Sequence, residues 1–205
     1  MLFRSEDLAR LRKSPQLEGF AARGVEVLLL TDPVDEFWIP AIVDYEGKPF
    51  KSATRAGAEL GAIPVISEKK EETPPAEAGK IDNLIALLKL TLKDDVKDVR
   101  VSERLTDTAV CLVSDEGDMD IRLERMLKQH RQLEAATKRI LEINPRHQLI
   151  KALAGLVGAE AGGARLADAA WLLLDQARII EGEQLPDPGA FSRRLSDAMA
   201  RGFTV

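Results

Sequence analysis

The order of hydrophobic and polar positions predicts a small α/β unit in the first third of the chain. Residues 25–30 are β-branched at their start and continuously apolar from residue 27 onward, which is typical of a central parallel strand buried on both faces. A capping Thr31-Asp32 pair and a proline then predict a helix over residues 34–42, with its aromatic residues and Ile42 turned inward. The other elements predicted here are helices over residues 6–12 and 17–22 and a hairpin over residues 43–52.

A second unit follows a polar stretch. Residues 64–80 have almost nothing to bury and predict a linker that runs into the next helix. Apolar side chains spaced three and four apart then predict an amphipathic helix over residues 76–94. Three short segments with strand-like patterns predict one small sheet, and they are Val99–Val101, Val110–Val113 and Arg139–Ile143.

Helical periodicity dominates the remainder of the chain. Residues 118–133 carry Met and Leu side chains on one helical stripe together with His130. Such a stripe is usually core, but methionine also suits surfaces that accept varied apolar partners, so the pattern leaves both interpretations open. Further helices are predicted over residues 147–157, from Gly162-Gly163 to Glu181-Gly182, and from Asp187-Pro188 to Arg201-Gly202.

Composition narrows the class of protein. The 205 residues are 45% hydrophobic with a net charge of −5, which indicates a folded chain of one large or two small domains. The excess of acidic over basic residues argues against a nucleic-acid partner. No apolar run approaches the ~20 residues that a membrane helix needs. The lone Cys111 cannot form an internal disulfide, so a reducing compartment, the cytoplasm, is expected.

Catalytic and metal-binding motifs are weak. The sequence has no phosphate-binding glycine loop, and zinc would have only Cys111, His130 and His147 on separate elements. A nucleophilic pair of Cys111 with either histidine is conceivable, but an apolar strand favours a buried, inert thiol. The acidic group Asp115, Glu116, Asp118 and Asp120 is better explained as a solvated, helix-capping turn than as a calcium site.

The last two helices are unusually apolar for a chain end. Burying side chains such as Leu173 and Leu195 contributes ~1.5–3 kcal/mol each, against an association cost of ~4–15 kcal/mol. Pairing with a second copy would close a four-helix bundle. Packing of both helices on the preceding sheet is the alternative, and periodicity alone leaves the two open.

Several separated strings, in the same order, resemble the heat-shock protein 90 chaperones in their bacterial HtpG branch. They are residues 14–18 (SPQLE), 24–36 (GVEVLLLTDPVDE), 47–50 (GKPF), 96–100 (VKDVR), 104–108 (RLTDT), 141–145 (LEINP) and 172–177 (LLLDQA), followed by Asp187-Pro188. Together they span nearly the whole chain, so the chain is similar to a fragment of this family.

The resemblance implies a fold class of α+β or α/β in two parts. Residues 1–70 correspond to the end of the family's middle domain. Residues 71–205 correspond to its carboxy-terminal dimerisation domain, with a three-stranded sheet, flanking helices and a helical dimerisation hairpin. The ATP-binding domain has no counterpart, so no ATP or magnesium and no hydrolysis are expected here. Because the printed sequence ends without an acidic tail, as in the bacterial branch, docking of helical-repeat co-chaperones is not expected.

The resemblance further implies two binding surfaces. A homodimer interface is expected on the last two helices, at Leu166, Ala169, Ala170, Leu173, Leu174, Ala177, Ile180, Phe191, Leu195, Ala198 and Met199. Unfolded or partly folded clients are expected at Met119, Leu123, Met126 and Leu127. The function predicted is therefore the dimerising and client-binding portion of an ATP-dependent chaperone. The alternatives are a self-standing dimeric adaptor and an enzyme that uses Cys111 as nucleophile.

Overall fold

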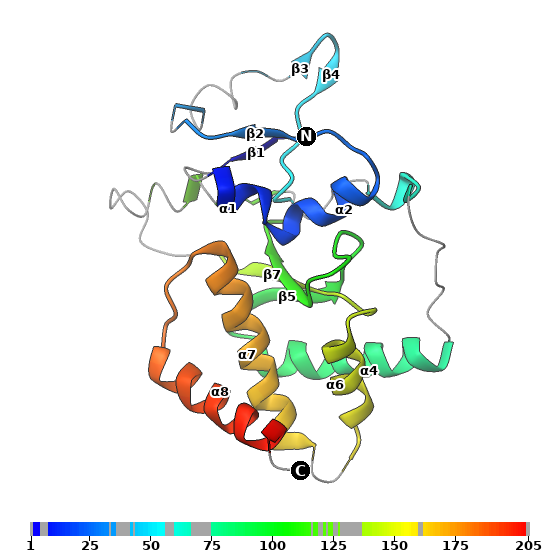
Figure 1. The fold of residues 1–205 in the computed structure, drawn as a ribbon, viewed down its shortest axis with the longest axis vertical. Coiled ribbons are helices and arrows are strands. Elements are labelled where there is room, and N and C mark those ends of the chain that lie inside the picture. The colour runs from blue at the N-terminus through cyan, green and yellow to red at the C-terminus, as the bar shows by residue number, and fades with distance from the viewer. Residues whose placement is uncertain are drawn as a thin grey trace.

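The chain is mixed α and β, with a three-stranded sheet at its centre (Figure 1). The computed structural model describes residues 2–4, 8–32, 34–35, 42, 44–55, 60–66, 75–115, 117–118, 121, 123–124, 127, 137–159 and 162–203. The amino-terminal elements lie on one side of the sheet, and four long helices lie on the other. The sheet is therefore covered on both faces.

The amino-terminal elements include a short parallel pair of strands, β1 (Leu2–Arg4) and β2 (Leu28–Leu30). The parallel pairing of the 25–30 run is confirmed, but full burial is wrong, because the Leu28 side chain is 55% exposed. Among the described residues, β2 pairs only with β1, so it has no neighbour on its other edge. Helices α1 (Leu8–Arg12), η1 (Pro15–Leu17) and α2 (Glu18–Ala22) confirm the two predicted helical segments.

A tight hairpin follows, built from β3 (Asp44–Tyr45) and β4 (Lys48–Pro49). Its turn residues Glu46 and Gly47 have φ of 51° and 75°, as a two-residue hairpin turn that matches strand twist requires. The predicted hairpin is confirmed, with shorter strands. The inward orientation predicted for Ile42 is wrong, because it is 42% exposed, and most of the helix predicted over 34–42 lies outside the described residues.

The three-stranded sheet predicted from the second unit is confirmed. It consists of β5 (Val96–Val101), β6 (Val110–Val113) and β7 (Arg139–Ile143), with β7 in the middle. Strand β5 runs parallel to β7, and β6 runs antiparallel to it. Alternate residues face opposite sides, so Leu141 and Cys111 belong to different apolar clusters. Both β6 and β7 are buried along their whole length, since each face of the sheet is packed.

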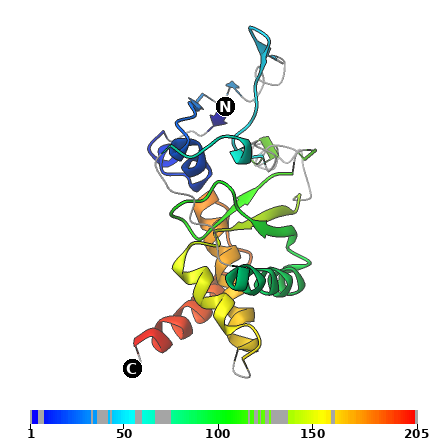
Figure 2. The ribbon, with the colours of Figure 1, turned by 90° about the vertical axis from the view of Figure 1, so that its right-hand side faces the viewer.

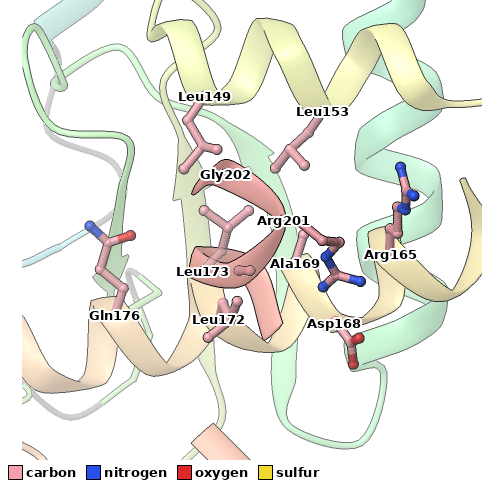
Figure 3. A pocket seen from close by; sticks show the side chains of 11 residues that line it. Leu149, Leu153, Arg165, Asp168, Ala169, Leu172, Leu173, Gln176, Arg201 and Gly202 are labelled. Atoms are coloured by element: carbon pink, nitrogen blue, oxygen red, sulfur yellow. The ribbon is translucent and has the colours of Figure 1, made fainter. Parts of the chain in front are cut away.

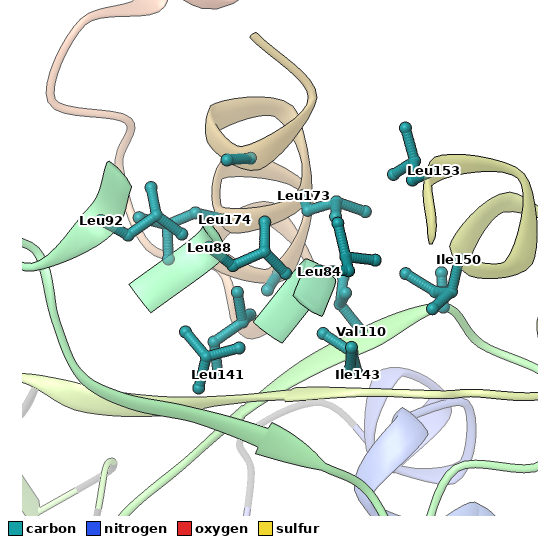
Figure 4. Close-up of a cluster of buried hydrophobic side chains, with 14 of the residues drawn as sticks. Leu84, Leu88, Leu92, Val110, Leu141, Ile143, Ile150, Leu153, Leu173 and Leu174 are labelled. Carbon is teal, nitrogen blue, oxygen red and sulfur yellow. The ribbon is translucent and has the colours of Figure 1, made fainter. Parts of the chain in front are cut away.

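The other face of the sheet is covered by α4 (Pro75–Leu92), α6 (Gln148–Leu156) and α7 (Gly163–Glu181), and α8 (Pro188–Phe203) packs on α7. All four helices were predicted, and α4 starts within the end of the predicted linker. The main core lies where α4, α6 and α7 meet the sheet (Figure 4). Its labelled side chains are Leu84, Leu88, Leu92, Val110, Leu141, Ile143, Ile150, Leu153, Leu173 and Leu174.

Candidate interaction surfaces

Helix α7 turns one face into the core and leaves the opposite face accessible. Its end is fixed by Gly182, whose φ of 78° allows a left-handed cap that few other residues adopt. Five residues of the predicted dimer interface are buried in this chain's own core, and they are Leu166, Ala170, Leu173, Leu174 and Ala177. A partner would therefore reach only the more exposed members of the predicted interface, together with Leu172 and Ile179 nearby.

Helix α8 packs on α7, and polar contacts near its start help to fix it there. The Asp187 carboxylate accepts a hydrogen bond of 2.8 Å from the Ala190 backbone N–H, which caps the helix. The Arg194 guanidinium lies 5.3 Å from the centre of the Trp171 ring and 3.6 Å from the Asp168 carboxylate. Ala190 is the helix's buried residue, so α8 contributes little apolar surface to the core.

Helix α8 carries an apolar row that the described part of the chain covers only at its start. Phe191, Leu195, Met199 and Phe203 follow one another at steps of four and so lie on one helix face. Phe191 is half-buried, Met199 is 52% exposed and Phe203 is 81% exposed. Figure 2 shows the carboxyl end of α8 running away from the rest of the molecule. We call these four residues the α8 row.

An apolar cavity of about 360 Å³ opens beside this row, between α6, α7 and the end of α8. Leu149 and Leu153 of α6 face Leu172 and Leu173 of α7 across it (Figure 3). Its remaining lining residues are Arg165, Asp168, Ala169, Gln176, Ala198, Arg201 and Gly202. Three residues of the predicted dimer interface, Ala169, Leu173 and Ala198, therefore line an open apolar cavity. Leu149 and Leu153 on α6 were not among the predicted interface residues.

The segment predicted to contact clients is described only in part. Met119 and Met126 lie outside the described residues, whereas Leu123 and Leu127 are helical and half-buried. The Glu124 carboxylate of this segment is buried and accepts hydrogen bonds from the Arg139 guanidinium and from the Thr137 backbone N–H, the latter at 2.9 Å. A buried ion pair therefore connects Glu124 to the central strand.

A buried charge cluster links the amino-terminal elements to the sheet, and sequence analysis missed it. The Glu142 carboxylate of β7 accepts hydrogen bonds from Arg100, Ser102 and Arg104 at 2.7, 2.8 and 3.0 Å. The Arg104 guanidinium also donates to the backbone carbonyls of Ala53 at 2.6 Å and Arg55 at 2.7 Å. Charged residues are rarely buried, so Glu142 was not expected in the core. The alternation of apolar and polar residues in β7 gives no sign that Glu142 has charged partners on other segments.

A second connection involves the start of α2. The Glu18 carboxylate accepts hydrogen bonds from the backbone N–H groups of Thr106, Asp107 and Thr108, at 2.8, 2.9 and 3.2 Å, and from the Thr108 hydroxyl. The buried Gln16 amide donates to the Leu112 carbonyl at 2.9 Å. Both residues belong to the string that carried the family resemblance, so that string also forms the junction with the sheet.

Cys111 is buried in β6, as predicted for an inert thiol. Its Sγ is 3.9 Å from the Glu142 carboxylate, and burial raises the pKa of the thiol well above its usual value. His147 caps α6, where its Nδ1 accepts a hydrogen bond from the Leu149 N–H, and His130 lies outside the described residues. A raised thiol pKa disfavours the thiolate that a nucleophile would need.

The described part of the chain contains no group of three or more His, Cys, Asp or Glu side chains that could hold a metal ion. Of the acidic turn, Asp115 and Asp118 both bind the Lys97 ammonium, at 2.8 and 3.0 Å, while Glu116 and Asp120 lie outside the described residues. None of the helices among the described residues has the length and apolar character needed to cross a bilayer.

The exposed features described above are helix faces and an apolar cavity, which are the surfaces that proteins use to bind other proteins. The family model for Hsp90 protein matches residues 2–205. This chain belongs to the Hsp90 family, whose members named below are chaperones.

Chaperone proteins HtpG from several bacteria are close relatives. The chain is 55% identical over 201 residues to that of Paramagnetospirillum magneticum and 56% identical over 197 residues to that of Azorhizobium caulinodans. It is 52% identical over 196 residues to that of Roseobacter denitrificans. These alignments cover 97%, 96% and 95% of this chain and 32%, 31% and 32% of the relatives. The chain thus spans about a third of the length of the curated relatives it matches.

Proposed function

We propose that this chain is the dimerising and client-binding portion of an ATP-dependent molecular chaperone. The exposed part of the α8 row is the observation that carries the dimerisation part of this proposal. A row of four apolar side chains, increasingly exposed toward Phe203, lies next to an apolar cavity on the same end of the molecule. Contiguous exposed apolar surface of this kind marks protein interaction sites. The permanent pairing of two protomers would keep two attached ATPase domains at high effective concentration.

Light scattering of a charged variant in the row tests the dimerisation proposal. Met199 is half exposed, so Met199→Asp leaves the core intact but places a charge in the proposed interface. We expect the variant to have the monomer mass at micromolar concentration. The matched control is Leu90→Asp, at an apolar side chain on α4 that is 74% exposed, and it should keep the dimer mass. Dimer mass in both variants would contradict the proposed interface.

Client binding is proposed for the 118–133 segment, at Met119, Leu123, Met126 and Leu127. Support comes from its Met- and Leu-rich composition, from the buried pair that ties Glu124 to Arg139, and from the partial exposure of Leu123 and Leu127. Met126→Asp should weaken the binding of a reduced, alkylated and therefore unfolded protein without changing the mass of the dimer. Unchanged affinity, with Leu90→Asp again as control, would assign this stripe to a structural role.

We further propose that ATP binding and hydrolysis belong to a domain outside this chain. The protein is proposed to be cytoplasmic. The resemblance to Hsp90 chaperones supports this, since the matched strings correspond to the later part of the family's sequence. ATP hydrolysis by the isolated chain should equal the background without protein. Turnover above that background, lost on denaturation of the chain, would contradict the proposal.

A further inference from the structure

One buried side chain connects the amino-terminal elements to a long helix on the other face of the sheet. Gln16 of η1 has no exposed surface, and its Nε2 group donates to the Leu112 carbonyl of β6 at 2.9 Å and to the Glu181 Oε1 atom at 2.7 Å. Glu181 is the last residue of α7, and Figure 1 shows that end of the helix directed toward the amino-terminal elements. Gln16 thus joins η1, β6 and α7, which are far apart in the sequence.

Each end of the Gln16–Glu181 contact carries an unfavourable feature. The Gln16 Oε1 atom is buried and has no hydrogen-bond donor among the described residues, although an amide oxygen normally accepts at least one hydrogen bond. Rotating the amide by 180° would not remove the defect, because the oxygen would then face the Leu112 carbonyl and the Glu181 carboxylate. A carboxylate in the last turn of α7 is also disfavoured by the negative end of the helix dipole. Departures of this kind occur more often at functional contacts than at purely structural ones.

The neighbouring connections to the sheet have no such defect. The Glu18 carboxylate accepts from three backbone N–H groups and from the Thr108 hydroxyl, and the Arg104 guanidinium donates to three acceptors. Breaking either connection would leave several hydrogen bonds of a charged group unmade. Opening the Gln16–Glu181 contact instead gives a partly exposed carboxylate to water and lets the orphan oxygen find a donor. The amino-terminal elements would therefore stay on the sheet while the end of α7 is released.

We infer that the Gln16–Glu181 contact is a latch that opens and closes within the folded chain and makes the order of the last turn of α7 depend on η1. Coupling between two sites is reciprocal, so a change that loosens η1 loosens the end of α7, and a change at the end of α7 loosens η1 by the same factor. The latch acts within one chain. It therefore depends neither on the proposed dimer nor on the proposed client site.

Amide hydrogen exchange, followed by NMR, tests the latch at both of its ends. The Glu183 N–H donates to the Arg178 carbonyl at 2.9 Å and reports on the end of α7. The Leu17 N–H donates to the Ser14 carbonyl at 3.0 Å and reports on η1. In the wild-type chain both amides should exchange at rates that low urea concentrations barely change, because a local opening exposes little surface. The amide of Leu174, in the middle of α7, should exchange by an unfolding that urea strongly promotes.

Each variant is read at the end of the latch remote from its substitution. Gln16→Leu should speed the exchange of the Glu183 amide by about 5-fold, as the loss of one hydrogen bond predicts. Glu181→Ala should speed the exchange of the Leu17 amide by a similar factor. Glu181→Gln keeps an acceptor oxygen and should leave the Leu17 amide at its wild-type rate. Gln148→Leu, at an exposed glutamine that starts α6, is the matched control and should change neither rate.

Unchanged exchange at the remote end in either variant would overturn the inference. An equal acceleration of the Leu174 amide, or a urea dependence as steep as that of Leu174, would also overturn it, because the contact would then break only when the whole chain unfolds. Glu181 is partly exposed, so Glu181→Ala should fold even where Gln16→Leu does not, and its result alone then decides. A monomeric wild-type chain would contradict the proposed dimer and leave this test in force.

Discussion

Replacement of Arg104 by methionine should uncouple the amino-terminal elements from the sheet. The Arg104 side chain is 2% exposed, and its guanidinium donates to Glu142, to the Ala53 carbonyl and to the Arg55 carbonyl, each within 3.0 Å. Methionine fills a similar volume but removes the charge and all three donors. Breaking a buried ion pair by removing one partner typically costs ~3–5 kcal/mol, because the other charge stays buried. Glu142 keeps Arg100, which is partly exposed and compensates in part.

The assay is urea unfolding followed by circular dichroism at one fixed protein concentration, since dimerisation would make stability concentration-dependent. We expect Arg104→Met to lower the free energy of unfolding by ~3 kcal/mol or more. The double variant Arg104→Met/Glu142→Met should recover part of this loss, because no unpaired buried charge is left. Arg12→Met, at an exposed position on α1, is the matched control and should change stability by less than ~0.5 kcal/mol. A loss below ~1 kcal/mol for Arg104→Met would refute the coupling assigned to this cluster.

Three further predictions concern stability. The raised pKa of Cys111 means that, above the thiol's ordinary pKa of 9.0, the unfolded chain loses a proton that the folded chain keeps, so stability should fall as pH rises through that value. Cys111→Ala should flatten this alkaline slope in pH-dependent urea titrations, and an identical slope would contradict the assignment. Gly19→Ala would place a Cβ 2.6 Å from the Arg104 Cα and should destabilise the chain, whereas Gly155→Ala meets open space in a helix and should stabilise it by ~0.5–1 kcal/mol in thermal melts. Glu18→Gln replaces a charged acceptor of several hydrogen bonds by a neutral one and should cost ~1–2 kcal/mol, while equal stability of the two chains would show that the charge contributes nothing.

Much of the architecture could be predicted because its signals are local. Helix periodicity, the Asp187-Pro188 start and the Gly182 end define α7 and α8, and the short apolar segments around Val110 and Leu141 define the sheet. Each of these signals depends on residues a few positions apart. That these strands share one sheet could be predicted, but their order, with β7 in the middle, could not.

The features that could not be predicted depend on contacts between distant segments. Leu28 lies in an apolar run, but its exposure depends on which strands pair beside β2. Likewise, nothing near Arg104 in sequence indicates that two carbonyls at residues 53 and 55 will accept its hydrogen bonds. The interface residues illustrate the same limit: periodicity identified the apolar face of α7, but not that the core uses most of it while the end of α8 stays exposed.

The mass of the wild-type chain in solution tests the central claim most directly. Light scattering over a micromolar concentration series should give twice the chain mass of 22.5 kDa, as a symmetric dimer joined through α7 and α8 requires. A mass of 22.5 kDa throughout that series would contradict the account.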